Sequence, residues 1–108
     1  MDARLSDLAE QLLLIERELR ILGWWESVSP TAQDLASQEP FCVDTLNFAQ
    51  WLQWIFLPRM KIIIESDSGL PERSGIRPMA EVVYQSDTHN VAALLDALGE
   101  FDRLIEHR

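Results

Sequence analysis

The side chains that could perform chemistry in this chain are few, and their spacing keeps them apart. There is one cysteine, Cys42, and there are two histidines, His89 and His107. A nucleophilic thiol needs a base within hydrogen-bond reach, and Cys42, between Phe41 and Val43, is distant in sequence from both histidines. The histidines are about 27 Å apart along one predicted helix, too far to share a metal ion. We therefore expect a buried thiol and surface or capping histidines, with no metal site.

Glycines and carboxylates suggest no other reactive site. Gly69 and Gly75 lie among acidic residues rather than at a strand-to-helix turn, so no phosphate-binding loop is predicted. No acid has a visible neighbour that would shift its pKa toward acid or base catalysis. We expect a protein that is not an enzyme and that binds no cofactor.

The charge of the chain limits its partners. Eighteen acidic residues against nine basic ones give a formal net charge of -9, and no Lys or Arg lies between Arg20 and Arg59. Binding to a nucleic-acid backbone requires clustered cations, and an anionic membrane surface would repel this chain. A basic protein partner would instead be attracted. The alternative is that the acidity only keeps the protein in solution.

Length and composition indicate one domain spanning residues 1–108, because a chain of this size can bury about two-thirds of its surface. A single cysteine cannot form an intramolecular disulfide, and the first residues lack the pattern of a signal peptide. No apolar run is long enough to span a bilayer. These features predict a cytoplasmic protein that does not associate with membranes.

The periodicity of apolar residues is helical along the chain. A leucine-rich stripe from Leu5 to Leu22 predicts a first helix that Gly23 ends. Ser29, followed by proline, predicts the cap of a short helix that reaches Ala36, before an extended turn at Glu39-Pro40.

The second long helix is predicted from Asn47 to Ser66. The Asn47 side chain can cap it while Gln50 reaches back to form a capping box. Asp44 and Thr45, at the entrance to this helix, are expected to satisfy free amides in its first turn or to form an ion pair.

This second helix is apolar on every side, as expected of a central helix or of one half exposed at the interface of a homodimer. Pro58 removes an amide and presses on the carbonyl of Trp54, which predicts a kink or a free acceptor.

Residues 66–78 are rich in glycine and proline and read as a loop. A brief helix from Pro78 to about Gln85 follows, and Thr88 or Asn90 is expected to cap a last helix that is apolar on one face. No alternating strand pattern occurs. The predicted fold is all-α: a single helical bundle of three long helices plus two short ones.

One segment has a recognisable signature, made of the strings Gln38-Glu39-Pro40-Phe41, Asp44-Thr45, Trp51-Leu52-Gln53-Trp54 and Leu57-Pro58-Arg59-Met60. In these strings the chain resembles the YqcC-like family of small bacterial proteins. The resemblance covers essentially the whole chain and implies a small helical bundle without an established activity. Genes of this family commonly neighbour the gene for tRNA pseudouridine synthase C, and that enzyme's name has been applied to some members.

The enzyme's name is not matched by catalytic residues. A pseudouridine synthase of that class needs an Asp in a Gly-Arg-Leu-Asp type motif on a mixed sheet. The nearest string here, Asp102 to Ile105, has Ile105 at the position of the nucleophile. We expect an accessory role beside such an enzyme rather than its activity.

The candidate partner or ligand surface comprises four tryptophans and two neighbouring residues: Trp24, Trp25, Trp51, Trp54, Pro58 and Arg59. Indoles are favoured interface anchors, although in a small domain they more often fill the core. Arg59 lies on an apolar strip, so we expect it to pair with Asp44 or Glu81, to extend to solvent, or to point into a pocket.

Three hypotheses remain. The preferred one is a non-catalytic interaction or accessory protein, whose partner is another copy of itself or a basic RNA-modification enzyme such as a pseudouridine synthase. The second is a small-molecule binding module with an apolar pocket near Trp51, Trp54 and Arg59. The third, an enzyme with carboxylate chemistry, is least favoured.

Overall fold

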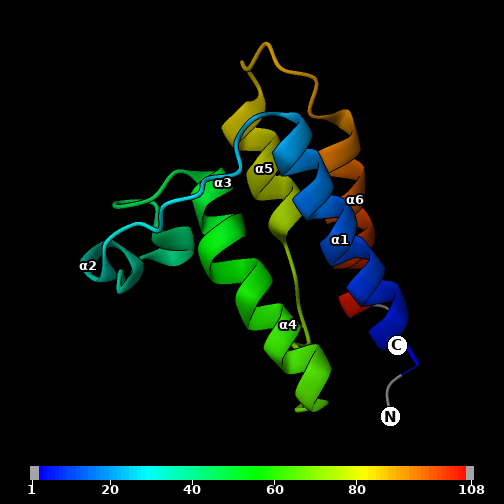
Figure 1. The fold of residues 1–108 in the computed structure, drawn as a ribbon. Coiled ribbons are helices and arrows are strands. Elements are labelled where there is room, and N and C mark those ends of the chain that lie inside the picture. Colours follow the sequence, from blue (N-terminus) through cyan, green and yellow to red (C-terminus); the bar gives the residue numbers. More distant parts are fainter. Residues whose placement is uncertain (1–2, 107–108) are drawn as a thin grey trace.

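The structure is a computed structural model that describes residues 3–106, and within that range it contains helices and no strand (Figure 1). The elements, in chain order, are α1 (Leu5–Ile21), α2 (Ala32–Leu35), η1 (Pro40–Cys42), α3 (Phe48–Trp51), η2 (Leu52–Phe56), α4 (Leu57–Ser66), α5 (Ile76–Tyr84) and α6 (Ala92–Glu106). Two are not α-helical, since η1 is a 3₁₀ turn and η2 is a π turn. The predicted all-α fold is confirmed.

The core forms where α1 packs between α6 and α4, with α5 against α6. Its fully buried side chains are aliphatic residues and one ring from several helices: Leu8, Ile15, Leu19, Leu52, Leu57, Leu94, Leu98, Phe101 and Ile105. Their spacing by three and four along α1 and α6 explains why each helix turns one face inward. Figure 1 shows α2 and its connecting segments to one side of this bundle.

The end of α1 positions the first tryptophan. Gly23 has a φ of 78°, in the left-handed region that favours glycine. The Trp24 amide donates to the Leu19 carbonyl at 2.9 Å, and the Gly23 amide donates to the Arg20 carbonyl at 3.1 Å. This pair of bonds is the Schellman arrangement. It turns the chain so that Trp24 packs against the core.

The short helix α2 begins later than predicted. Its cap is Thr31, whose hydroxyl accepts from the Asp34 amide at 3.1 Å, whereas the Ser29 hydroxyl donates to the Pro30 carbonyl. The prediction of Ser29 as the cap was therefore wrong. A threonine two residues further on supplies the same acceptor and leaves Pro30 outside the helix.

The second long helix runs from Phe48 to Ser66 after its cap Asn47, close to the predicted bounds, but it changes type midway. Segments α3 and α4 flank the π turn η2, where the Leu57 amide donates to the Leu52 carbonyl five residues earlier. Pro58 follows immediately, in the first turn of α4. One wider turn of helix thus immediately precedes Pro58, where a kink or a free acceptor was expected.

Helix α5 starts at Ile76, two residues before the predicted start at Pro78, and the reason lies in α6. The Asp102 carboxylate accepts from the amides of Ile76 at 3.1 Å and Arg77 at 2.9 Å, and also from the Ser74 hydroxyl. These amides have no partner within their own helix. A carboxylate from another helix therefore caps α5, and Pro78 occupies its first turn, where no amide is needed.

At the start of α6, Asn90 supplies the acceptor; it is one of the two residues, Thr88 and Asn90, that were predicted to cap this helix. The Asn90 side-chain oxygen accepts from the Ala92 amide at 3.1 Å. At the other end, the Arg4 guanidinium donates to the carbonyls of Leu104 and Ile105 at 2.8 and 2.9 Å. The start of α1 is thereby fastened to the end of α6.

Candidate functional site

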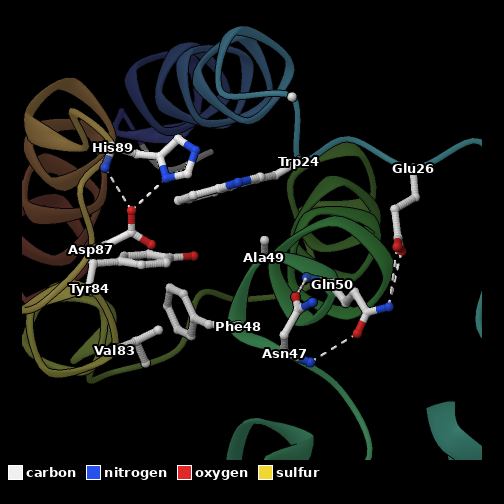
Figure 2. Close-up of a pocket in the computed structure, with 11 residues that line it drawn as sticks. Trp24, Glu26, Asn47, Phe48, Ala49, Gln50, Val83, Tyr84, Asp87 and His89 are labelled. Atoms are coloured by element: carbon white, nitrogen blue, oxygen red, sulfur yellow. Dashed lines mark hydrogen bonds and ion pairs between the residues drawn. The ribbon is translucent and has the colours of Figure 1, made fainter.

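A cavity of about 390 Å³ lies where the loop after α1, the start of α3 and the end of α5 meet (Figure 2). Its lining combines aromatic, carboxylate and amide side chains: Gly23, Trp24, Glu26, Asn47, Phe48, Ala49, Gln50, Val83, Tyr84, Asp87 and His89. No Lys or Arg is among them. The volume lies within the range of small ligand sites.

One wall is a stack of rings drawn from three parts of the chain. The rings of Trp24 and Tyr84 are stacked with centroids 4.9 Å apart, and His89 meets Trp24 edge-on at 5.2 Å. Phe48 meets Tyr84 edge-on at 5.9 Å. Figure 2 shows the four rings layered in the order His89, Trp24, Tyr84 and Phe48. Such offset and edge-on pairs hold a preformed aromatic wall.

The hydroxyl of Tyr84 stays neutral throughout the physiological range. Burial, followed by the negative charge of Asp87, raises the pKa of Tyr84 to about 12. Figure 2 shows this hydroxyl pointing into the space in front of Ala49. It can act there as both a hydrogen-bond donor and an acceptor.

Asp87 and His89 form a local pair at the rim. The Asp87 Oδ1 atom is 2.7 Å from the His89 amide nitrogen and 2.6 Å from its Nδ1. The amide bond first, and then the ring bond, lower the pKa of Asp87 below its usual value. Asp87 is therefore a carboxylate at neutral pH, and its Oδ2 accepts no hydrogen bond from any described residue.

The opposite rim is built around Glu26. The Gln53 side chain accepts from the Glu26 amide at 2.8 Å and donates to the Glu26 carbonyl at 2.6 Å. The Glu26 carboxylate in turn accepts from Gln50 Nε2 at 3.2 and 3.3 Å and from Trp54 Nε1 at 3.2 Å. Three side chains of the second long helix thus hold both the backbone and the carboxylate of one loop residue.

The floor is fixed by the start of α3. The Asn47 side chain accepts from the Gln50 amide at 2.8 Å, and the Gln50 side chain accepts from the Asn47 amide at 2.9 Å. This is the capping box that the sequence predicts. Because Gln50 also donates to Glu26, the cap of α3 and the rim of the cavity share one side chain.

The four predicted tryptophans have different environments. Trp24, Trp25 and Trp51 are half-buried and pack against the core. The Arg20 guanidinium lies 4.6 Å from the ring centre of Trp25. Trp54 is half-buried too, but it is not part of the packing around the core, and its indole nitrogen bonds to Glu26.

Trp51 belongs to a second aromatic group on the other side of Phe48. Its ring lies 4.7 Å from Phe41, 5.9 Å from Phe48 and 5.5 Å from Phe56. Phe41 reaches it because η1 holds Phe41 and Cys42 at positive φ values of 58° and 50°. Such values are uncommon for side chains of this size, so the surrounding contacts must hold the turn in place.

Pro58 and Arg59 are both exposed on α4. Arg59 pairs with neither Asp44 nor Glu81, so the expectation of such a pair was wrong, because each acid has a nearer partner. Asp44 accepts from the Ser37 hydroxyl, and Glu81 lies 3.7 Å from Arg77. Within residues 3–106, Arg59 makes no ion pair and extends to solvent.

Neither Pro58 nor Arg59 lines the cavity described above, and nor do Trp51 and Trp54. Of the six candidate surface residues, only Trp24 lies in its wall. The cavity described above therefore differs from the small-molecule pocket expected near Trp51, Trp54 and Arg59, since it lies at the start of α3.

Asp44 and Thr45 do not cap the long helix as expected. The Thr45 hydroxyl donates to the Asp34 carbonyl at 2.8 Å, and the Asp44 carboxylate accepts from the Ser37 hydroxyl. Both residues precede Asn47 and lie in the turn after η1. They fasten α2 to that turn, and Asn47 alone acts as the cap of the long helix.

Cys42 is buried and forms no disulfide, as predicted. His89 is exposed at the cavity rim, and His107 lies outside the described residues. Within the described range, no group of three or more His, Cys, Asp or Glu residues could hold a metal ion. No helix of residues 3–106 combines the length and apolar character needed to cross a membrane.

Sequence reasoning missed most of the cavity. Glu26, Gln50, Tyr84 and Asp87 were not among the candidate residues, because their proximity depends on contacts between separate helices. One local signal existed: Gln53 is a polar residue inside an otherwise apolar helix, and it is only 5% exposed. A buried amide must find partners, and those partners are in the loop that forms the rim.

Comparison with protein families and solved structures places this geometry in context. The DUF446 family model, described as tRNA pseudouridine synthase C, matches residues 7–104. The solution NMR structure of protein YqcC from Escherichia coli superposes with a TM-score of 0.85 at 27% identity, covering 98% of this chain and 91% of that one. The fold described above is therefore shared with a structure determined by experiment.

Three curated relatives are similar in sequence. "Uncharacterized protein YqcC" of Escherichia coli K12 is 31% identical over 87% of this chain and 86% of its own length. An uncharacterized protein of Haemophilus influenzae is 40% identical over 67% of this chain and 65% of its own. A protein of Pectobacterium carotovorum named tRNA pseudouridine synthase C is 41% identical over 64% of this chain. That last match spans only 18% of the longer protein.

Proposed function

The chain belongs to the DUF446 family of YqcC-like proteins, and on this premise we propose that it is a non-catalytic accessory protein that binds a tRNA pseudouridine synthase. The observation that carries the proposal is the Pectobacterium relative. A segment similar to this chain makes up less than a fifth of a longer protein that has the enzyme's name. Segments joined in one polypeptide in one bacterium can act as separate, associating proteins in another.

The residues of this chain support association rather than catalysis. The sequence lacks a Gly-Arg-Leu-Asp string, and the described residues contain no sheet of the kind that carries the nucleophile of such enzymes. The paired polar groups of the cavity, Asp87 with His89 and Glu26 with Gln50, are local contacts at its rim. We propose that these groups contribute to binding a partner rather than to catalysis.

Charge favours a protein rather than tRNA as the direct partner. The net charge is -9, and the loop, crossover and helix that surround the cavity contribute no Lys or Arg from residue 21 to residue 58. Enzymes that bind tRNA present basic surfaces, which would attract this acidic region. We place the contact on the face where Trp54 borders the rim of the cavity.

The test is a binding experiment between the purified chain and the tRNA pseudouridine synthase C of the same bacterium. Size-exclusion chromatography with light scattering, and calorimetry at low and moderate salt, should show a complex that weakens as salt rises. The chain alone should not bind tRNA. A chain that binds tRNA directly and leaves the synthase unbound at low salt would overturn the proposal.

A further inference from the structure

We propose that the cavity at the start of α3 receives the guanidinium group of an arginine side chain from a protein partner. The inference rests on the proposed function for the source of that arginine. The recognition itself depends on cavity residues, and it can be tested without any partner protein.

The two carboxylates of the cavity, Glu26 and Asp87, have no Lys or Arg beside them in its lining. Some carboxylates elsewhere in the structure have basic neighbours: Glu16 lies 3.0 Å from Arg20, and Glu18 lies 3.3 Å from Arg17. By contrast, the Glu26 carboxylate accepts only from the neutral side chains of Gln50 and Trp54.

Asp87 is in the same situation. Its partner is the His89 ring, 2.6 Å away. No Lys or Arg lines the cavity, so neither Asp87 nor Glu26 has one of these cations beside it there. Figure 2 shows Asp87 next to the Tyr84 ring and Glu26 on the other side of the start of α3. Both carboxylates attract a cation that enters the cavity.

The cavity also presents hydrogen-bond acceptors that are not fully used. Each carboxylate can accept about four hydrogen bonds. The Oδ2 of Asp87 accepts none from residues 3–106, and Glu26 retains capacity beyond its three bonds. The Tyr84 hydroxyl, which also has no hydrogen-bond partner among the described residues, lies between these rims. A guanidinium offers five donors in a planar fork, which suits acceptors spread around a space.

The walls of the cavity suit the stem of an arginine side chain. Trp24, Tyr84 and Phe48 form an apolar aromatic surface along which the methylene stem of arginine can lie. Arginine is also more weakly hydrated than lysine, which lowers the cost of leaving water. The chain already places one of its own guanidinium groups on an indole, at Arg20 and Trp25.

The cavity is also continuous with the proposed docking face. Glu26 accepts from Trp54 on one side and from Gln50, in the wall of the cavity, on the other. A partner that covers Trp54 would therefore place its neighbouring side chains at the cavity mouth. An arginine there would be the anchored, central residue that interfaces commonly use.

The experiment uses the amide-blocked amino acid Nα-acetyl-arginine amide as the probe and two-dimensional NMR of the ¹⁵N-labelled chain as the readout. Saturable shifts are expected at the Trp24 indole and at the amides of Ala49 and Gln50. The corresponding citrulline compound has nearly the same shape but no charge, and it should bind about tenfold more weakly or not at all. The lysine compound should also bind more weakly than arginine.

The variant for this test is E26Q/D87N, which keeps one oxygen at each position for the existing hydrogen bonds while removing both charges. It should weaken binding of the arginine probe by about tenfold or more. The matched control is E10Q, because Glu10 is exposed on α1 and outside the cavity. Circular dichroism checks that both variants fold. Equal binding of citrulline and arginine, or undiminished binding by E26Q/D87N, would overturn the inference.

The same variants separate this inference from the proposed function. If the chain binds the synthase but the arginine probe produces no shifts at the cavity, the inference fails and the accessory role stands. If the probe binds at the cavity and the synthase does not bind, the inference about the cavity is supported and the proposed accessory role is contradicted. If both hold, E26Q/D87N should also weaken synthase binding while E10Q leaves it unchanged.

Discussion

The side-chain amide of Gln53 makes two hydrogen bonds to the backbone of Glu26: its oxygen accepts from the Glu26 amide, and its nitrogen donates to the Glu26 carbonyl. The contact imitates the pairing of two strands, but it links a helix to a loop 27 residues earlier in the chain. These two bonds hold the Glu26 backbone, and with it one rim of the cavity, in place against the helix. The shape of the cavity therefore depends on a residue that does not line it.

Replacing Gln53 by Met should destabilise the protein although the volume hardly changes. The loss of two hydrogen bonds to partly buried backbone groups should lower the free energy of unfolding by about 1–3 kcal/mol, measured by urea denaturation. Gln33→Met, on the exposed face of α2, is the matched control and should change it little. A Gln53→Met variant as stable as the control would show that water replaces the amide.

Trp51 and Trp54 should respond in opposite ways to truncation. Trp51→Ala removes a ring packed against Phe41, Phe48 and Phe56, so the free energy of unfolding should fall by about 3 kcal/mol. Trp54→Ala loses one hydrogen bond to Glu26 and should cost about 1 kcal/mol.

Binding to the synthase should show the reverse order for these two tryptophans. Trp54→Ala should weaken the complex clearly, because an aromatic side chain at the centre of an interface commonly dominates the affinity. A folded Trp54→Ala variant with unchanged affinity would remove Trp54 from the docking face.

Tyr84 gives a direct optical test, because it is the only tyrosine of the chain. Absorbance at the tyrosinate band should titrate with a pKa of about 12 in the folded protein and about 10 in denaturant. Since the folded pKa is the higher one, stability should be unaffected by this group below about pH 10 and should fall as pH rises from there toward 12.

The matched variant for that titration is Tyr84→Phe, which keeps the ring stack with Trp24 but has no ionisable group. The free energy of unfolding of this variant should fall less between about pH 10 and 12, because it has no hydroxyl to ionise. A single titration near the ordinary tyrosine value in both folded and unfolded protein would contradict the burial of this side chain.

Asp102→Ala should loosen α5 before it loosens the rest of the fold. The variant leaves the amides of Ile76 and Arg77 without their acceptor, a loss expected to cost about 1–2 kcal/mol. Amide hydrogen exchange should accelerate in the first turns of α5 more than in α1. Glu10→Ala, which removes an exposed carboxylate from α1, should leave exchange in α5 as it was.

The fold was predictable where its signals are local. The leucine spacing of α1, the capping box of Asn47 and Gln50, and the glycine after α1 all act within one or two turns of helix. The true start of α5 was not predictable in this way. Its cap, Asp102, is 26 residues beyond Ile76, and nothing near Ile76 in the sequence indicates it.

The sequence predicted that tryptophans would form the candidate site, but it did not predict where in the fold the site lies. The sequence identified tryptophans as a binding surface, and one of them, Trp24, does line the cavity. The partners that make the cavity, Tyr84 and Glu26, come from other segments and meet only once the helices pack. For Arg59 the sequence left three choices, a pair, a pocket or solvent, and in the structure the side chain is exposed.

The π turn Leu52–Phe56 has a consequence for how this chain can change in length. A π turn holds one residue more than a regular α-helix would use to connect the same two flanking segments. Losing a residue such as Ile55 would let the turn become α-helical while Leu57 and Met60 keep their orientation toward the core. The same deletion within α4 would rotate every later side chain by about 100°. The turn is thus the place on this helix where evolution could delete one residue without disturbing the interior.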